Sequence, residues 1–154
     1  MDCLNKAAAA LLRGLAGAQA PAADTDTLHR ANELLGSDPE NREAWQELVE
    51  EESRLPEWMM NLLGTASPMK AVEDDGDKFL VGQLCEAQNC TNQRLYVAFS
   101  WNKEDAWALY VQVPDGMPSD KSPSRHASYR WLGEPDEDVR RILDEQLKMD
   151  PNWY

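Results

Sequence analysis

The chain has 154 residues, enough for one well-packed domain, and its 28 acidic against 15 basic residues give a formal charge of −13. Such a charge argues against binding to nucleic acid or to anionic membranes and favours a basic partner, although acidity often serves solubility alone. The sequence has no run that approaches the ~20 apolar residues of a membrane span.

The first 30 residues form an alanine-rich segment that we expect to differ from the rest of the chain. Lys6 followed by the apolar run 7–12 begins like a signal peptide, and residues 16–18 could serve as a cleavage site. Arg13 interrupts the apolar run early, so the sequence favours a short amphipathic helix or a leader remnant. We predict a single domain over residues 31–154.

Two helices are predicted ahead of any strand. Apolar residues recur at helical spacing between positions 28 and 35, and Gly36 is expected to end this helix in a left-handed conformation. Ser37, followed three residues later by Glu40, predicts a capping box at the start of the second helix. That helix should end before Pro56.

From residue 69 the apolar pattern alternates, which predicts strands. Five strands are expected, over residues 69–72, 79–84, 94–99, 107–113 and 129–132. A final helix carries one apolar stripe, made of Val139, Ile142, Leu143 and Leu147. The predicted class is α+β, with an antiparallel meander of about five strands and helices from both ends of the chain packed on one face.

Two cysteines, Cys85 and Cys90, lie on either side of the four residues 86–89, between two predicted strands. An oxidised pair would indicate a periplasmic or extracellular setting, whereas two reduced thiols or half of a metal site are the alternatives. A metal site needs more ligands, and neither His29 nor His126 has finger-like spacing to the cysteines, so we expect no metal. The third cysteine, near the N-terminus, has no assigned role.

A disulfide between these two cysteines would serve function more than fold. Closing so short a span adds only about 2 kcal/mol of stability in the chain-entropy model. It would, however, hold the cysteine loop, residues 85–90, as a stiff projection. A stiff projection suits insertion into a partner's cleft because little conformational entropy is lost on docking.

The sequence lacks the local motifs of common catalytic sites. It contains no glycine-rich phosphate loop, no Gly-x-Ser-x-Gly elbow and no His-Glu-x-x-His pair. A glycosidase-type carboxylate pair stays open as an alternative, since spatial separation is not readable from sequence. We expect a protein that is not an enzyme and holds no cofactor.

Six tryptophans could line a sugar groove, but tryptophan is more often part of a core. Trp45, Trp107 and Trp131 are in phase with apolar neighbours and are expected in the core. Trp58, Trp101 and Trp153 are less constrained, and one of them could anchor an interface.

Several segments carry a family resemblance. The stretch 85–99 around the cysteine loop, the run 127–135 and the ending 150–153 match in order and in spacing, and residues 33–36 and 55–58 match more loosely. Together they resemble the inhibitor of vertebrate lysozyme (Ivy) family over residues 31–154. The resemblance implies a sheet of this size backed by helices, with the cysteine loop projecting at one end.

In that family the loop typically carries a basic residue first and a histidine third, and the histidine enters the lysozyme cleft and hydrogen-bonds the catalytic carboxylates. Here Glu86 takes the basic place and Gln88 takes the place of the histidine, while Ala87 and Asn89 fall within the family's usual range. Gln88 can still donate N–H bonds to a carboxylate, but it cannot become cationic. Glu86 would bring a negative charge close to the target's carboxylates.

The resemblance implies a periplasmic inhibitor of a lysozyme-like muramidase that blocks the enzyme's cleft with residues 86–89. Its partner would be a basic lysozyme or another peptidoglycan glycoside hydrolase. The alternative is an immunity or self-protection protein that binds a bacterial peptidoglycan-cleaving enzyme, a toxin or an autolysin, through the same loop. A homodimer is left open by the sequence.

Overall fold

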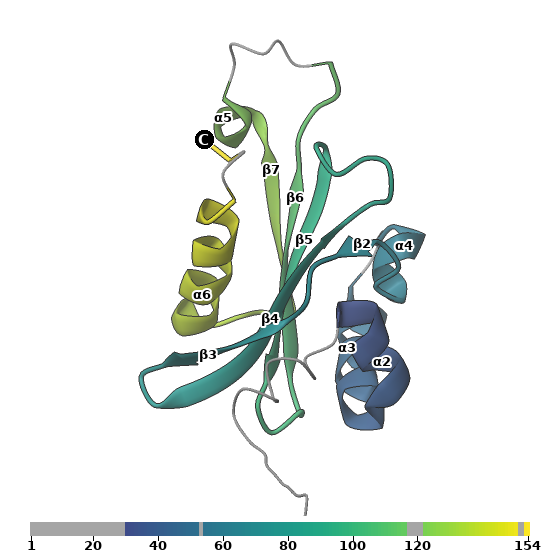
Figure 1. Ribbon diagram of the computed structural model, residues 1–154, viewed down its shortest axis with the longest axis vertical. Coiled ribbons are helices and arrows are strands. Elements are labelled where there is room, and N and C mark those ends of the chain that lie inside the picture. Colours follow the sequence, from purple (N-terminus) through teal and green to yellow (C-terminus); the bar gives the residue numbers. More distant parts are fainter. Residues whose placement is uncertain (1–29, 53, 117–121, 151–152) are drawn as a thin grey trace, which may run out of the picture.

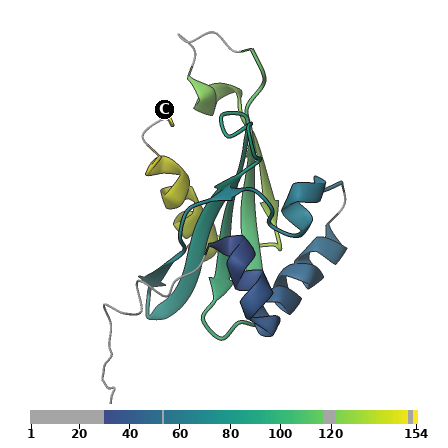
Figure 2. The same cartoon turned by 45° about the vertical axis from the view of Figure 1, so that its right-hand side comes forward.

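The computed structural model describes residues 30–52, 54–116, 122–150 and 153–154. A twisted antiparallel sheet runs through the molecule, with helices on both of its sides (Figures 1 and 2). Residues 1–29 of the alanine-rich segment, which include Cys3 and His29, lie outside the described residues, so what we expect of them stays a prediction. No described helix is both long and apolar enough to cross a membrane.

The sheet and helices follow the predicted order along the chain. The helices are α2 (Ala31–Ser37), α3 (Pro39–Glu51), α4 (Glu57–Met60), α5 (Pro123–His126) and α6 (Glu137–Lys148). The strands are β2 (Thr65–Ala66), β3 (Lys70–Asp74), β4 (Asp77–Cys85), β5 (Gln93–Ser100), β6 (Ala106–Gln112) and β7 (Ser128–Leu132).

The strand order is β2-β4-β5-β6-β7. Strand β3 pairs with the same outer edge of β4 as β2 does, but nearer the start of β4. All of the pairings are antiparallel. The predicted α+β class and the meander from β3 to β7 are confirmed, and β2 adds a sixth strand.

The central strand, β5, is buried on both of its faces from Arg94 to Phe99. Alternate side chains of a strand face opposite sides. Leu95, Val97 and Phe99 pack in a cluster with residues of α2 and α3, whereas Tyr96 and Ala98 pack in a second cluster with the stripe of α6. The prediction that the helices cover one face is therefore wrong: both faces of β5 are apolar, so each needs its own cover.

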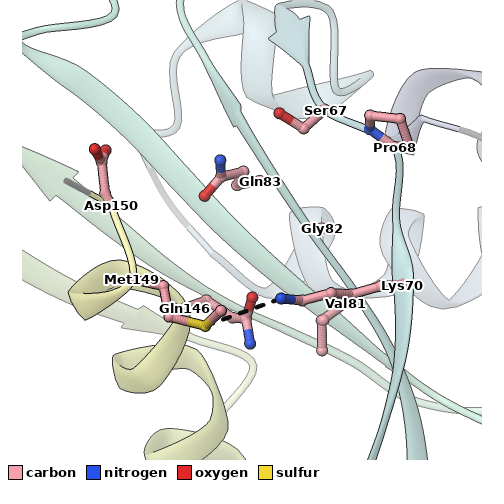
Figure 3. Close-up of a pocket in the computed structure, with 9 residues that line it drawn as sticks. All are labelled: Ser67, Pro68, Lys70, Val81, Gly82, Gln83, Gln146, Met149 and Asp150. Carbon is pink, nitrogen blue, oxygen red and sulfur yellow. Dashed lines mark hydrogen bonds between the residues drawn. The ribbon is translucent and has the colours of Figure 1, made fainter. Parts of the chain in front are cut away.

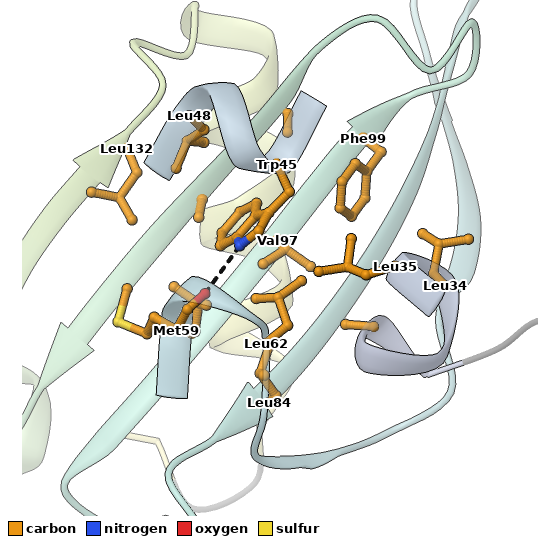
Figure 4. Close-up of a cluster of buried hydrophobic side chains, with 14 of the residues drawn as sticks. Leu34, Leu35, Trp45, Leu48, Met59, Leu62, Leu84, Val97, Phe99 and Leu132 are labelled. Carbon is orange, nitrogen blue, oxygen red and sulfur yellow. Dashed lines mark hydrogen bonds between the residues drawn. The ribbon is translucent and has the colours of Figure 1, made fainter. Parts of the chain in front are cut away.

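Trp45 joins the helices on the first face. Its side chain is fully buried, and its indole Nε1 donates a hydrogen bond to the carbonyl of Met59 (3.0 Å; Figure 4). The same N–H also donates to the carbonyl of Met60 (3.2 Å). Its ring lies tilted against Phe99 of β5, with centroids 6.3 Å apart. One side chain thus fixes α4 relative to α3 and to the centre of the sheet.

The boundary between α2 and α3 differs from the prediction by one residue. Gly36 lies inside α2 rather than ending it, and Asp38 rather than Ser37 caps α3. The Asp38 carboxylate accepts hydrogen bonds from the N–H groups of Glu40 (3.1 Å) and Asn41 (3.3 Å). It also forms an ion pair with Lys103 (2.7 Å), which an aspartate can make and a serine cannot.

Replacing this cap should destabilise the fold in a pH-dependent way. Burial acts to raise the pKa of Asp38, but Lys103 and the two capping N–H groups hold it below the ordinary value. At neutral pH Asp38→Ala should lower the free energy of unfolding by about 1 kcal/mol in urea denaturation. The native state gains stability from an ionised Asp38 above the unfolded-state pKa and loses it as the pH falls through the lower native pKa. The two stability curves should therefore converge in acid.

Glu43→Ala, at an exposed position of the same helix, is the matched control and should change stability by less than about 0.5 kcal/mol. Equal stability of Asp38→Ala and the parent chain at neutral pH would contradict the capping role.

Candidate functional site

The cysteine loop connects the end of β4 to the start of β5. A disulfide joins Cys85 to Cys90, with their Cα atoms 4.8 Å apart, so the predicted pairing is confirmed. Cys85 is the last residue of β4, and Gln93, three positions after Cys90, begins β5. The loop therefore connects two neighbouring strands, one of which, β5, is the most buried strand of the sheet.

Hydrogen bonds within the loop hold one compact turn. The N–H of Asn89 donates to the carbonyl of Glu86 (2.9 Å), which closes a four-residue turn. The Asn89 side-chain amide donates to the Glu86 carboxylate (2.8 Å), and the Glu86 N–H donates to the carbonyl of Gln93 (3.2 Å). Glu86 and Asn89 are half-buried and engaged with each other, which leaves Ala87 and Gln88 as the exposed tip.

Gln88 has a left-handed backbone, with φ of 65°. It occupies the third position of the turn, where type II turns require positive φ and favour glycine or asparagine. A residue with a long side chain in this conformation costs about 1–2 kcal/mol. The disulfide and the Glu86–Asn89 bond close the turn around Gln88, which sets the direction in which its side chain leaves the backbone.

The base of the loop is tied to the end of β6. The Asn92 side-chain amide donates to the carbonyls of Val113 (3.0 Å) and Pro114 (3.1 Å), and the Val113 N–H donates back to the Asn92 carbonyl (2.8 Å). The Tyr110 hydroxyl donates to the side-chain carbonyl of Gln93. These contacts make the loop part of a three-strand unit rather than a free hairpin end.

Tyr110, on β6, lies close enough to the loop for the charge of Glu86 to affect its pKa. Burial raises the pKa of its hydroxyl, and the Glu86 carboxylate raises it further. Its ring meets Trp58 of α4 edge-on, with centroids 6.5 Å apart. Trp58 is therefore half-buried against the sheet rather than exposed.

Gly64 brings the segment after α4 against the root of the loop. A Cβ at this position would overlap the carbonyl of Cys85 and would lie 3.4 Å from the Trp58 ring. Thr65, the next residue, pairs with Cys85 across the sheet. The close approach requires glycine, and it couples α4 mechanically to the cysteine loop.

Two glycine substitutions should have opposite effects on stability. Gly64→Ala should lower the free energy of unfolding by about 1–3 kcal/mol, because the added methyl group collides with the backbone of β4. Gly36→Ala should raise it by up to about 1 kcal/mol, because Gly36 is helical and nothing lies within 4 Å of the new Cβ. Chemical denaturation of both variants checks this, and a neutral Gly64→Ala would rule out the tight contact.

On the other face, Arg94 links the base of the loop to the end of the chain. Its guanidinium is buried, pairs with the Asp150 carboxylate (2.7 Å) and lies over the ring of Trp153, 5.2 Å from the centroid. Burial raises the pKa of the neighbouring Tyr96 hydroxyl, an effect that Arg94 opposes. Sequence reasoning did not single out Arg94, but a charged residue inside a buried strand could have signalled it.

A hollow of about 310 Å³ opens between the outer edge of β4 and the end of α6 (Figure 3). Lys70, Gln83 and Gln146 are among its polar lining residues, and Lys70 donates a weak hydrogen bond to the sulfur of Met149 (3.9 Å). A smaller hollow of about 170 Å³ shares Gln83 with it and reaches the disulfide. We assign neither hollow a catalytic role.

One cluster of three acidic residues in the described part of the chain has the spacing of a cation site. Carboxylate oxygens of Asp74, Asp75 and Asp138 lie within 4.8 Å of one another. Arg141 pairs with both Asp74 and Asp138, so its guanidinium already offsets part of this charge. The cluster is an ion-pair network between β3 and α6.

The remaining candidates from the sequence lie apart from the cysteine loop. Trp101 is 50% exposed but follows the far end of β5. His126 ends α5 and is exposed. Trp45 is in the core as predicted, whereas Trp107 and Trp131 are only partly buried against the second cluster.

The fold and this site define an α+β protein that presents a rigid, disulfide-closed loop at one end of its sheet. The model of the family described as "Inhibitor of vertebrate lysozyme (Ivy)" matches residues 40–149. The chain belongs to this family, and the resemblance inferred from its sequence is confirmed.

Curated relatives match nearly the whole chain. An uncharacterised protein of Pseudomonas aeruginosa is 62% identical over 146 residues, covering 95% of this chain and 94% of its own length. An uncharacterised Yersinia pestis protein is 37% identical over 133 residues, covering 86% and 84%. A second P. aeruginosa protein, named "Inhibitor of vertebrate lysozyme", is 36% identical over 155 residues, covering 99% of both chains.

Proposed function

We propose that this protein inhibits a lysozyme-like muramidase by inserting the tip of the cysteine loop into the enzyme's active-site cleft. The observation that carries the proposal is the geometry of the tip: Ala87 and Gln88 project from a turn that is closed by a disulfide and by the Glu86–Asn89 bond. A preorganised tip loses little entropy on binding. The function is binding rather than catalysis.

Gln88 is the residue that would meet the catalytic carboxylates. Its amide nitrogen carries two N–H donors that point in different directions, so it can bond one oxygen from each of two carboxylates. The amide donor is uncharged, whereas hydrogen bonds in which both donor and acceptor are charged are roughly twice as strong as neutral ones. The loop should therefore bind a vertebrate-type lysozyme more weakly than a loop with histidine at this position.

Glu86 does not stand in the way of this docking. Its carboxylate accepts a hydrogen bond from Asn89 and is half-buried at the side of the turn, behind the exposed tip. It therefore need not enter the cleft beside the target's carboxylates, where like charges would repel. At the side of the loop it adds to the net charge of −13 that steers the protein toward a basic enzyme.

The setting that fits this function is the periplasm. The disulfide needs an oxidising compartment, and peptidoglycan-cleaving enzymes act on that side of the inner membrane. The partner is a basic lysozyme or another peptidoglycan glycoside hydrolase.

The composition of the cysteine loop favours a second candidate, an immunity or self-protection protein. Glu86 and Gln88 stand where the family typically has a basic residue and a histidine, so the loop has lost the cation that suits a vertebrate-type lysozyme. A bacterial toxin or autolysin whose cleft accepts a neutral amide would be matched instead. Both candidates use the same loop and differ in the identity of the enzyme.

Substitutions at Gln88 test the insertion directly. Gln88→Ala should weaken inhibition of peptidoglycan hydrolysis by about tenfold or more, because the amide donors are lost. Gln88→His should strengthen inhibition of a vertebrate-type lysozyme, because a histidine can supply a charged donor. Titration of the lysozyme with each variant under non-reducing conditions gives the inhibition constants.

Gln46→Ala, at an exposed position on α3, is the matched control and should leave inhibition unchanged. If the parent chain inhibits the enzyme and both Gln88 variants inhibit it equally well, the loop does not enter the cleft. Inhibition of a bacterial peptidoglycan-cleaving enzyme, with indifference to the vertebrate-type lysozyme, would select the second candidate.

Removing the disulfide should separate binding from stability. In the double variant Cys85→Ser/Cys90→Ser the loop loses its covalent closure, so affinity for the target should fall by at least tenfold. The free energy of unfolding should fall by only about 2 kcal/mol, because the closed span is short. Calorimetry alongside the inhibition assay measures both, and a much larger loss of stability would show that the bond serves the fold.

A further inference from the structure

The tip of the cysteine loop is too small to form a specific complex on its own. It exposes Ala87 and Gln88, whereas a stable protein–protein interface buries about 800 Å² on each partner. Further surface beside the loop must therefore contact the target, and the segment that ends α4 packs against the root of the loop.

The end of α4 is built around a residue in an unusual conformation. Leu62 has φ of 52°, at the position after the helix cap where glycine is normal. The N–H of Leu62 donates to the Met59 carbonyl (3.3 Å), and the N–H of Leu63 donates to the Trp58 carbonyl (2.7 Å). This is the bonding pattern of a Schellman motif, formed here without glycine.

The buried side chain of Leu62 explains how the motif persists. Leu62 is fully buried in the core, so its side chain anchors a backbone conformation that leucine otherwise avoids. With Leu62 turned inward, its neighbour Leu63 is 56% exposed, and Met60 on the last turn of α4 is 41% exposed. From the core side, the indole N–H of Trp45 fixes this turn by donating hydrogen bonds to the carbonyls of Met59 and Met60.

The same segment is locked to the root of the loop. Gly64, directly after Leu63, packs against the carbonyl of Cys85, and Thr65 pairs with Cys85 in the sheet. Figure 1 shows α4 beside β2, on the side of the sheet that carries α2 and α3. Two exposed apolar side chains are thus held at a fixed position next to the loop.

We propose that Met60 and Leu63 form an apolar shoulder that docks on the target enzyme beside the mouth of its cleft, while the loop enters the cleft. The inference rests on the function proposed above and names a second contact for the same partner. Glu57, exposed in the first turn of α4, adds a negative charge beside the shoulder. The matching surface on the enzyme is an apolar patch bordered by basic residues.

The test compares the shoulder with an equally exposed apolar residue elsewhere. The double variant Met60→Ala/Leu63→Ala should raise the inhibition constant at least tenfold, mainly through faster dissociation in surface plasmon resonance. Trp101→Ala is the control, because Trp101 is 50% exposed at the far end of β5 and should change the constant less than twofold. Thermal unfolding of each variant verifies the fold.

The outcomes separate the shoulder from the loop. If Gln88→Ala weakens inhibition and the shoulder variant does not, the shoulder is overturned while the proposed function stands. If the parent chain inhibits neither a vertebrate-type lysozyme nor a bacterial muramidase, the proposed function fails and the shoulder loses its partner. If the shoulder variant instead converts a dimer to a monomer in sedimentation with inhibition unchanged, the patch serves self-association and the proposal is overturned.

Discussion

The burial of β5 on both faces is the constraint on which the rest of the structure depends. Because six consecutive residues, Arg94 to Phe99, are buried, this strand must have β4 and β6 beside it and a helical layer above and below it. The cysteine loop leads directly into the first residues of this strand. The central strand of the core therefore anchors one end of the cysteine loop.

Much of the fold could be predicted because it depends on local patterns. Alternation in residues 94–99 and 107–113 predicted adjacent antiparallel strands, and the single stripe of α6 predicted a helix with one buried side. The second helical layer was missed because the small, partly polar face of β5, made of Tyr96 and Ala98, was not recognised as a buried face. The cap at Asp38 was missed because Ser37 and Glu40 fit the capping-box spacing, although the bonds of Asp38 to Glu40 and Asn41 are local. Only its ion pair with Lys103 joins residues far apart in sequence.

The candidate site shows the same division. The two cysteines are close in sequence, so their pairing and the projecting loop could be predicted from the chain alone. The left-handed backbone at Gln88 and the bond between Glu86 and Asn89 could not, since glutamine gives no signal for positive φ. The packing of Gly64 against Cys85 is likewise invisible in sequence, because it depends on β2 reaching the edge of β4. These unpredicted contacts hold the backbone of the tip and place the segment after α4 against the root of the loop.

The interrupted outer edge of the sheet has a consequence for self-association. Beyond β4 the edge consists of two short pieces, β2 and β3, separated by Ser67, Pro68 and Met69. Proline has no N–H to offer, and Arg30 bridges to Pro68 from outside. A second copy of the chain therefore meets no continuous row of free backbone groups along this border. A dimer formed by extending the sheet would therefore have five residues of strand edge to use at this border, along β3, and five along β7 at the opposite border.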